Sequence, residues 1–301
     1  MRSPLALALL VVVGCAAEAP GDRGRAGPLA VERPADGTWE PLVTLDWTVD
    51  PGVEQFTCGV ATVPKEVLAR RLRAIAPMGT HHVLATLAAG GPEGTFTCAP
   101  GTLSDVLLFA SGTDAGTLAL PPGVAMRIPA GAQVLVNVHL LNPRADALSG
   151  TSGIEVQAVP PGDVTDEAEM ILAGTTEFQI APHSVATATG RCRFRADATV
   201  THLWPHMHLL GTHMRVTHHG QAGDVTLLDA PYEFDDQRHY AIEPAQVREG
   251  ESLSVTCTWD NTTDRVVSFG DSTLDEMCFA GVVRYPATYE GLHCQPEGGG
   301  G

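Results

Sequence analysis

The sequence predicts an all-β protein made of two tandem antiparallel β-sandwich domains of jelly-roll-like form. Short segments rich in β-branched and other apolar residues recur along the chain, separated by Gly, Pro and Asp, whereas amphipathic helical patterns are nearly absent. Strand segments at regular spacing with turn residues between them are typical of sandwiches. The cluster Pro160–Asp163 lies near the middle and marks the expected boundary between an N-terminal domain (39–162) and a C-terminal domain (163–295).

The strand prediction rests on three segments: Gln133–Leu141, Val200–Val216 and Ser252–Trp259. The first alternates in side-chain character between two proline-containing turns, as a strand with two different faces does. The second closes in a turn expected at His218–Gly220, and the third ends in the polar run Asp260–Thr263. The segment Lys65–Arg73 is the only candidate for a helical turn, and its apolar pattern is weak.

The N-terminal residues predict export. Arg2 precedes an apolar run from Leu5 to Val13, which is too short to span a bilayer and has the form of a secretory signal. Cys15 at the cleavage position predicts a lipoprotein signal over residues 1–14 with Cys15 acylated; the alternative is an ordinary signal with an incidental cysteine. We therefore expect an exported, lipid-anchored protein of the cell envelope, on the periplasmic or outer-membrane side, that contacts the membrane only through lipid.

Composition separates the folded body from its flanks and limits its partners. Residues 15–38 are rich in Ala, Gly, Pro and charge without periodicity, which indicates a flexible linker, and residues 296–301 read as a disordered tail. The net charge of −17 argues against nucleic acid or an anionic surface as a partner.

Setting Cys15 aside leaves six cysteines, an even number that predicts disulfides in an exported chain. They are Cys58, Cys98, Cys192, Cys257, Cys278 and Cys294. Sequence alone permits about fifteen pairings, and pairing within halves is the economical one because two lie in the first half and four in the second. A full set of disulfides leaves no thiolate for a blue-copper site or a catalytic nucleophile.

Most of the twelve histidines need no functional explanation. His183, His239 and His293 stand beside turn residues, and we expect them to be solvated. His218 and His219 fall in the predicted hairpin turn, where display on the surface is the expected outcome.

Two groups of histidines have spacings that suit a metal. Neighbouring side chains of a flat strand point to opposite faces, so His81 and His82 can share one ion only at a strand end or bulge, which Pro77–Gly79 just before them can supply. His139 lies within an apolar strand, where a lone histidine is more often a satisfied core residue than a ligand. His206 and His208 are two apart, so both imidazoles face the same side of a strand at a chelating distance.

Met277, beside Cys278, is a further candidate ligand, although a methionine in a β-protein is usually core filler. Thioether suits Cu(I) and is a poor ligand for zinc. A set made of two histidines and this methionine therefore indicates copper.

Four segments, in order along the chain, resemble the copper type II, ascorbate-dependent monooxygenases, the family of peptidylglycine α-hydroxylating monooxygenase and dopamine β-monooxygenase. The segments are Thr80–Leu84, Leu135–His139, His206–Gly211 and Gly270–Cys278, the last with the string Asp-Glu-Met-Cys intact. The resemblance covers the chain from about Trp39 to Cys294.

The resemblance implies two copper ions per chain. One would be held by His81, His82 and His139 and supply electrons; the other would be held by His206, His208 and Met277, where O2 binds and the C–H bond is attacked. It also implies the disulfides Cys58–Cys98, Cys192–Cys294 and Cys257–Cys278. The implied activity is hydroxylation of an sp3 C–H bond of an unidentified small-molecule substrate, with O2 and ascorbate or a similar one-electron reductant.

Three positions depart from the peptide-processing members of the family. Those members place an Arg shortly before the His-x-His segment and an Asn and a Tyr just after Met-Cys, where this chain has Trp204, Phe279 and Gly281. A peptide carboxylate would be buried unpaired there, which costs several kcal/mol, so we do not expect peptide amidation. Trp204 and Phe279 indicate an apolar or aromatic substrate, or serve core packing.

Two other functional classes compete with an enzyme. A non-enzymatic, copper-binding or copper-delivering envelope lipoprotein would use the same ligands, and turnover with ascorbate and O2 would separate the two. An adhesin or structural sandwich protein would bind no metal. The division of ligands between two domains favours the enzyme, since a storage protein gains nothing from it.

Overall fold

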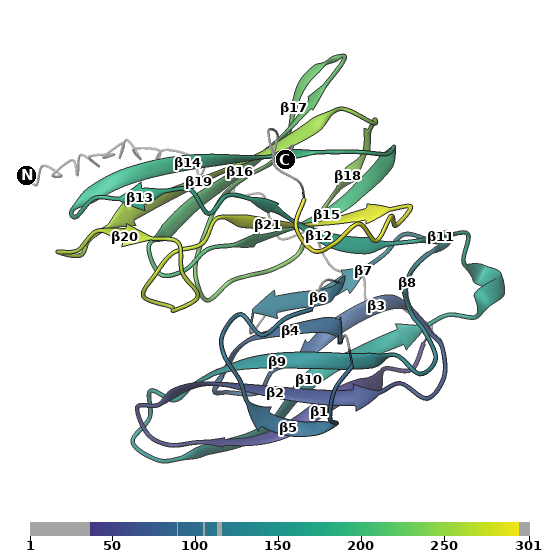
Figure 1. The fold of residues 1–301 in the computed structure, drawn as a ribbon, viewed down its shortest axis with the longest axis horizontal. Coiled ribbons are helices and arrows are strands. Elements are labelled where there is room, and N and C mark those ends of the chain that lie inside the picture. Colours follow the sequence, from purple (N-terminus) through teal and green to yellow (C-terminus); the bar gives the residue numbers. More distant parts are fainter. Residues whose placement is uncertain (1–36, 89, 105, 113–115, 295–301) are drawn as a thin grey trace, which may run out of the picture. The chain divides into compact units, whose positions relative to one another are not determined.

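Strands form nearly all of the regular structure in this computed structural model, which describes residues 37–294 except 89, 105 and 113–115 (Figure 1). The signal peptide (1–14), Cys15, nearly all of the linker and the C-terminal tail lie outside the described residues. The first half contains β1 (Glu40–Val49), β2 (Glu54–Thr62), β3 (Val67–Ile75), β4 (Thr80–Ala88), β5 (Gly94–Thr97), β6 (Val106–Gly112), β7 (Thr117–Ala119), β8 (Val124–Ile128), β9 (Gln133–Leu141) and β10 (Leu148–Ala158). A 3-10 helix, η1 (Pro161–Asp163), is followed by β11 (Asp166–Glu167), β12 (Glu169–Gly174), β13 (Gln179–Ile180), β14 (Ser184–Arg193), β15 (Ala198–His206), β16 (Gly211–Gly220), β17 (Gly223–Pro231), β18 (Tyr240–Val247), β19 (Ser252–Asn261), β20 (Val267–Ser268) and β21 (Phe279–Tyr285).

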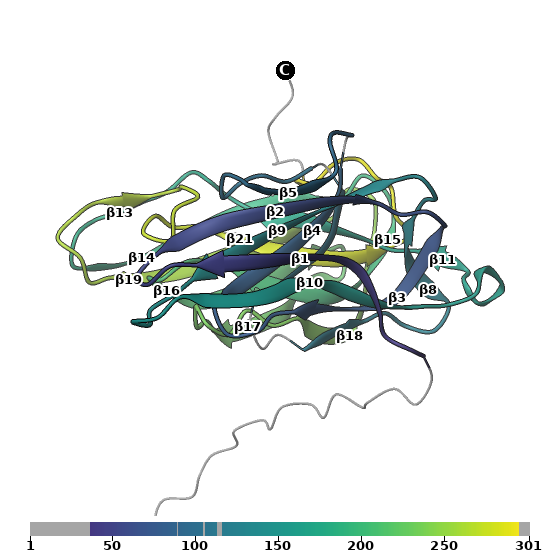
Figure 2. The same ribbon diagram turned by 90° about the horizontal axis from the view of Figure 1, so that it is seen from below.

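Alternating burial explains why these segments form one-sided strands. In β1 the side chains of Val43, Leu45, Trp47 and Val49 are buried, whereas those between them are exposed. This period of two places every second side chain on the same face of a pleated strand. Figure 2 shows β1 running beside its antiparallel partner β10.

The first half of the chain is a sandwich of two sheets. One sheet has the order β1-β10-β3-β8-β11, and the other is the β6-β4-β9-β2-β5 part of a nine-stranded sheet. An apolar core fills the space between them, with Trp47, Leu72, Phe109 and Val136 among its buried members. The pairing is antiparallel except for the short parallel contact of β11 with β8.

The second half repeats this arrangement. The β18-β15-β21-β12 part of the nine-stranded sheet faces the four-stranded sheet β14-β19-β16-β17. A second core, which includes Phe194, Val255 and Trp259, lies between these layers. The all-β class and the antiparallel sandwiches predicted from sequence are therefore confirmed. The domain boundary near residue 162 stays a prediction, and η1 occupies that position.

Two local predictions were wrong. Lys65–Arg73 contains no helical turn; most of it is β3, which pairs with β7, β8 and β10. Pairing on both edges outweighs a weak local pattern, since strand propensity depends on context. The predicted strand region Val200–Val216 is two strands, β15 and β16, separated by a short connection at residues 207–210.

Disulfides hold both halves. The pairs are Cys58–Cys98, Cys192–Cys294 and Cys257–Cys278, the same three that the resemblance implies, and each lies within one half of the chain. Within the described residues, no helix has the length and apolar character needed to cross a bilayer.

Candidate metal centres

A β-bulge brings His81 and His82 to one side of the sheet. The register between β4 and β9 shifts between Thr80 and His82, so His81 has no partner of its own in the ladder. Gly79, just before, has a φ of +99°, and a Cβ there would lie 2.9 Å from the Trp47 ring. The distortion expected from Pro77–Gly79 is present, and it removes the strict alternation that would separate the two imidazoles.

His139 completes the first group from the neighbouring strand. It stands directly opposite His82 in the β4–β9 ladder, and the two ring centroids are 4.7 Å apart. The Nδ1 atoms of His81 and His82 approach to 3.3 Å. One ring nitrogen from each of the three residues can be chosen so that all lie within 4.8 Å of one another. Three imidazoles thus converge on a space of the size that one ion fills.

The nitrogens of this first group fit a metal. Nδ1 of His139 and Nε2 of His81 are buried with no hydrogen-bond partner in the described structure. Glu54 accepts a hydrogen bond from Nε2 of His139 at 2.7 Å, which leaves the lone pair on Nδ1. A carboxylate bonded to the far nitrogen is the usual partner of a metal-binding histidine. Buried polar atoms without a partner are costly, and an ion would satisfy them.

The second group lies at the end of β15. The pairing of β15 with β18 stops at Leu203, whereas its pairing with β21 continues to His206. Pro205 is accommodated there because only one neighbouring strand remains. His206 ends the strand, His208 follows it, and their ring centroids are 5.4 Å apart. His208 thus lies outside the strand that the spacing of two assumed, and both rings line the same cavity.

Both histidines of the second group are oriented through Nδ1. The side-chain oxygen of Gln237 accepts a hydrogen bond from Nδ1 of His206 at 2.8 Å, and the carbonyl oxygen of Asp275 accepts one from Nδ1 of His208 at 3.1 Å. Each ring then keeps its unprotonated Nε2 for a ligand. Met277 lines the same cavity as both rings, and the next residue, Cys278, is held to β19 through its disulfide. The donors of this second group therefore also fit copper.

Burial keeps these imidazoles neutral. It is the largest cause that lowers the pKa of His81 to about 4, of His206 to about 3 and of His82 well below its ordinary value. Burial also lowers the pKa of His139 and His208, partly opposed by Glu54 and by the Asp275 carbonyl. A metal binds the neutral imidazole, so these groups are in the binding form at neutral pH.

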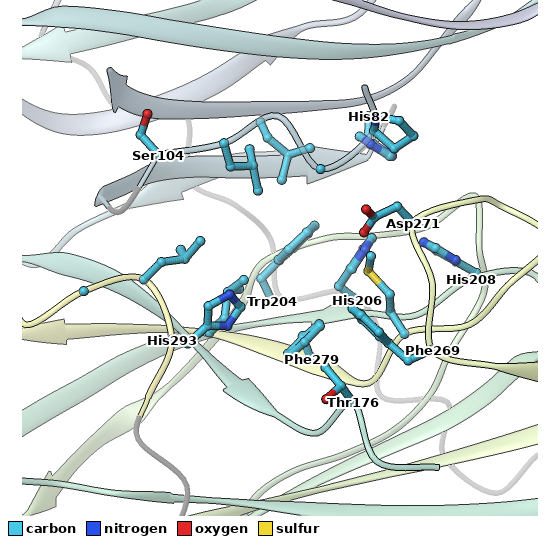
Figure 3. Close-up of a pocket in the computed structure, with 18 of the residues that line it drawn as sticks. His82, Ser104, Thr176, Trp204, His206, His208, Phe269, Asp271, Phe279 and His293 are labelled. Carbon is cyan, nitrogen blue, oxygen red and sulfur yellow. The ribbon is translucent and has the colours of Figure 1, made fainter. Parts of the chain in front are cut away.

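Candidate ligands from both groups line one cavity of about 710 Å3 (Figure 3). His82, His206, His208 and Met277 all line it, and the ring centroids of His82 and His206 are 6.2 Å apart. Its other lining residues are Phe56, Leu84, Pro100, Gly101, Leu103, Ser104, Leu172, Thr176, Trp204, Phe269, Asp271, Phe279, Glu290, Gly291, Leu292 and His293. Among the described residues that line it there are two carboxylates and neither lysine nor arginine.

Two of the three positions that depart from the peptide-processing members, Trp204 and Gly281, contact each other. Trp204 and Phe279 are buried and line the cavity, and Trp204 also belongs to the first core, so both interpretations made from sequence apply to it. The Trp204 ring stacks on His206 with centroids 4.9 Å apart. Gly281 stands opposite Trp204 in the ladder, and a Cβ there would lie 3.1 Å from the indole.

The exposure of the remaining histidines agrees only partly with the prediction from sequence. His183 is exposed, and His293 is an exposed lining residue of the cavity. His239 is not solvated, because it packs against Phe109 and hydrogen-bonds the Ala110 carbonyl, and burial lowers its pKa to about 3. The prediction that His218 and His219 occupy a turn was also wrong.

The hairpin turn follows Gly220, so both residues belong to β16. His218 is buried and bonds Glu251 at 2.9 Å, and His219 bonds Asp224 at 2.8 Å. A longer strand than predicted provides these carboxylate partners.

Several residues that shape the two groups could not be recognised from the sequence pattern. Gln237 orients His206, Phe234 stacks on His81 with centroids 4.0 Å apart, and Glu54 supports His139. They lie in loops or at a strand end and have no periodic signal. Glu276 stood inside the Asp-Glu-Met-Cys string, but nothing in that string distinguishes a buried acid from an exposed one.

A protein-family model matches the part of the chain that contains the second group. Residues 166–298 match the family described as copper type II ascorbate-dependent monooxygenase, C-terminal domain. The matched segment contains His206, His208 and Met277 together with the disulfide beside Met277. This segment therefore belongs to the family of copper type II ascorbate-dependent monooxygenase C-terminal domains.

Proposed function

We propose that this protein is a copper-dependent monooxygenase that hydroxylates an sp3 C–H bond of a small substrate, using O2 and a one-electron reductant such as ascorbate. Two copper ions per chain would be held by His81, His82 and His139 and by His206, His208 and Met277. The observation that carries the proposal is a group of three converging histidines beside a cavity that His82, His206, His208 and Met277 line, in a chain whose residues 166–298 match this family.

Bound copper would supply one-electron transfer and activation of O2. The chain's own residues provide the neutral ligands and their orientation. Gln237 and the Asp275 carbonyl each hold an imidazole proton at Nδ1, so the Nε2 atoms of His206 and His208 remain available at the cavity. Imidazole and thioether ligands carry no charge and favour Cu(I). The aromatic lining, which includes Trp204 and Phe279, limits the access of water to the reacting centre.

The cavity lining favours a substrate with an apolar or aromatic body. Phe56, Trp204, Phe269 and Phe279 contribute large apolar faces. A carboxylate placed there would meet Asp271 and no cationic side chain of the described lining residues. Desolvating an unpaired carboxylate costs several kcal/mol, so a glycine-extended peptide is not the proposed substrate.

We further propose that the protein is exported and anchored in the cell envelope by lipid on Cys15, since the N-terminal sequence has the form of a lipoprotein signal. A non-enzymatic copper-delivery protein is the alternative function, because its ligands would be the same. Consumption of O2 that depends on both ascorbate and a substrate distinguishes an enzyme from it.

The test is the copper content of soluble protein that lacks residues 1–15. We expect about two copper ions per chain in the parent, from the two ligand groups. Met277→Ala and His139→Ala should each lose or weaken one ion, because each removes a ligand from a different group. Metal analysis and ascorbate-dependent O2 uptake provide the measurement.

Matched controls are available elsewhere on the surface. Met78→Ala and His183→Ala remove an exposed thioether and an exposed imidazole, and both should retain the parent's copper. The proposed function would be contradicted if the parent binds no stoichiometric copper. It would also be contradicted if the parent binds a single copper ion whose binding does not change in Met277→Ala.

A further inference from the structure

A buried carboxylate lies beneath the second ligand group. The side chain of Glu276 has no exposed surface, and four N–H groups donate hydrogen bonds to it. The donors are the backbone N–H of His208 at 2.9 Å, of Leu210 at 2.6 Å and of Met277 at 3.3 Å, and the indole N–H of Trp259 at 2.9 Å. Three donors reach Oε2, and Leu210 alone reaches Oε1.

The two side-chain oxygens of Glu276 accept all four bonds. A glutamine of the same size would replace one oxygen with an NH2 group that has no acceptor capacity. At least one buried N–H would then face another donor and remain unpaired, which costs about 1–3 kcal/mol.

The donors identify what the carboxylate holds together. Two of them are the backbone N–H groups of His208 and Met277, which belong to segments far apart in the chain. Leu210 lies in the turn that follows His208, and Trp259 comes from β19, within the second core. Glu276 therefore joins both ligand-bearing segments to a rigid strand through one side chain.

The nearby disulfide cannot replace this connection. Cys257–Cys278 attaches the residue after Met277 to β19, whereas the backbone N–H of His208 donates its hydrogen bond to Glu276. A copper–thioether bond is weak, so its formation depends on how the protein framework places the sulfur relative to the imidazoles.

We propose that Glu276 is the positioning residue of the second copper centre. It fixes the backbones of His208 and Met277 relative to each other, so that the imidazole and the thioether bind the same ion. This inference rests on the proposed function, because it requires copper at His206, His208 and Met277. Glu276 itself contacts no substrate and donates no ligand atom. Its effect passes through the two backbone N–H groups.

Glu276→Gln in the copper-loaded protein tests the proposal. We expect a 10- to 100-fold weaker affinity for Cu(I) at the second centre, a range typical for residues that support metal ligands. The copper–sulfur contribution to the X-ray absorption spectrum of the reduced protein should also decrease, since Met277 no longer reaches the ion. Copper at the His81, His82 and His139 group serves as an internal reference and should be unchanged.

Glu251→Gln is the matched control. The Glu251 carboxylate also collects backbone N–H bonds, from Gln221 at 2.8 Å and Arg248 at 2.9 Å, together with His218, but in the hairpin region away from the ligands. Its loss should lower the melting temperature without changing the copper–sulfur signal. A folded Glu276→Gln protein with the parent's sulfur signal and Cu(I) affinity would overturn the proposal.

Trp259→Phe provides a second variant if Glu276→Gln fails to fold. It keeps the carboxylate and removes one donor to Oε2, so we expect a smaller loss of the sulfur signal in a folded protein; an unchanged signal would contradict the proposal.

Failure of the proposed function would give a different experimental result. A parent that shows no second copper with sulfur ligation would refute the proposed function, whereas a normal parent with an unaffected Glu276→Gln refutes only the role of Glu276.

Discussion

The pKa values of individual histidines in this protein depend more on burial than on the charges of neighbouring groups. Burial is the largest cause of the lowered pKa at all five candidate imidazole ligands, and also at His202 and His239, which are not candidate ligands. A lowered pKa alone therefore does not distinguish a ligand. Convergence of ring nitrogens on one space is the better criterion for a metal site, and His81, His82 and His139 meet it.

Acid should destabilise the metal-free protein because of these buried imidazoles. The pKa of His202 falls from 6.5 to about 4 on folding, so between these values the unfolded chain binds more protons and stability rises with pH. His202 therefore causes no loss of stability above pH 6.5. Its destabilising effect grows as the pH falls from 6.5 toward 4. In a plot of the free energy of unfolding against pH, His202→Gln should reduce the slope by up to about 1.4 kcal/mol per pH unit.

Denaturant unfolding of the metal-free parent and variant between pH 8 and pH 4 measures this slope. The difference at pH 8 gives the cost of the substitution itself, because His202 is neutral there in both states. Equal slopes for parent and variant over the acidic range would show that His202 does not contribute.

Single elements determine how the ligands meet. The β4 bulge turns His81 and His82 toward one space, and β15 ends at His206, two residues before His208. In both places a departure from regular pairing occurs at the ligand. Such irregularities are recurrent devices for aiming side chains at a site.

Gly79→Ala should disturb the first centre through the bulge. The residue has a φ of +99°, and a new Cβ would lie 2.9 Å from Trp47, so strain and overpacking together should cost about 2–4 kcal/mol. Copper at the first centre should weaken because Thr80 and His81 follow directly. Thermal unfolding and copper titration measure the two effects.

Gly52→Ala is the control for Gly79→Ala. Gly52 also has a positive φ, of +70°, but nothing lies within 4 Å of its added Cβ. It should lose about 1–2 kcal/mol from backbone strain alone and retain its copper. Equal copper binding in both variants would argue against a role of the bulge.

The sequence predicted those elements whose pattern is local. The bounds expected for the strand Gln133–Leu141 are those of β9, and the distortion after Pro77 was anticipated from proline and glycine. Residues 65–73 were misassigned because their pairing partners lie more than 40 residues away. Gln237 and Phe234 escaped prediction because tertiary packing alone brings that loop to the ligands.

Both halves of the chain line the cavity in which we propose that the substrate binds. The nine-stranded sheet passes through both halves of the chain, where β12 meets β6 at the pair Met170–Leu107. The cavity takes Phe56 and His82 from the first half and Trp204 and Phe279 from the second. Under the proposed function, selection of a substrate would therefore depend on both sandwiches together.

Substrates without an anionic group should be preferred. In ascorbate-dependent O2 uptake, we expect aromatic or aliphatic neutral compounds to stimulate turnover and a glycine-extended peptide to give none, since its carboxylate would find no cationic partner. Phe279→Leu should raise the KM for aromatic compounds without loss of copper. Phe96→Leu, at an exposed position, should leave the KM unchanged. Robust hydroxylation of the glycine-extended peptide would contradict this expectation.

The contact between Trp204 and Gly281 also constrains how this cavity can be redesigned. A Cβ at position 281 would lie 3.1 Å from the indole, so the ring has to shift to admit a larger residue. A larger residue at position 281 should therefore be combined with a smaller one at position 204, and the two positions should be varied together.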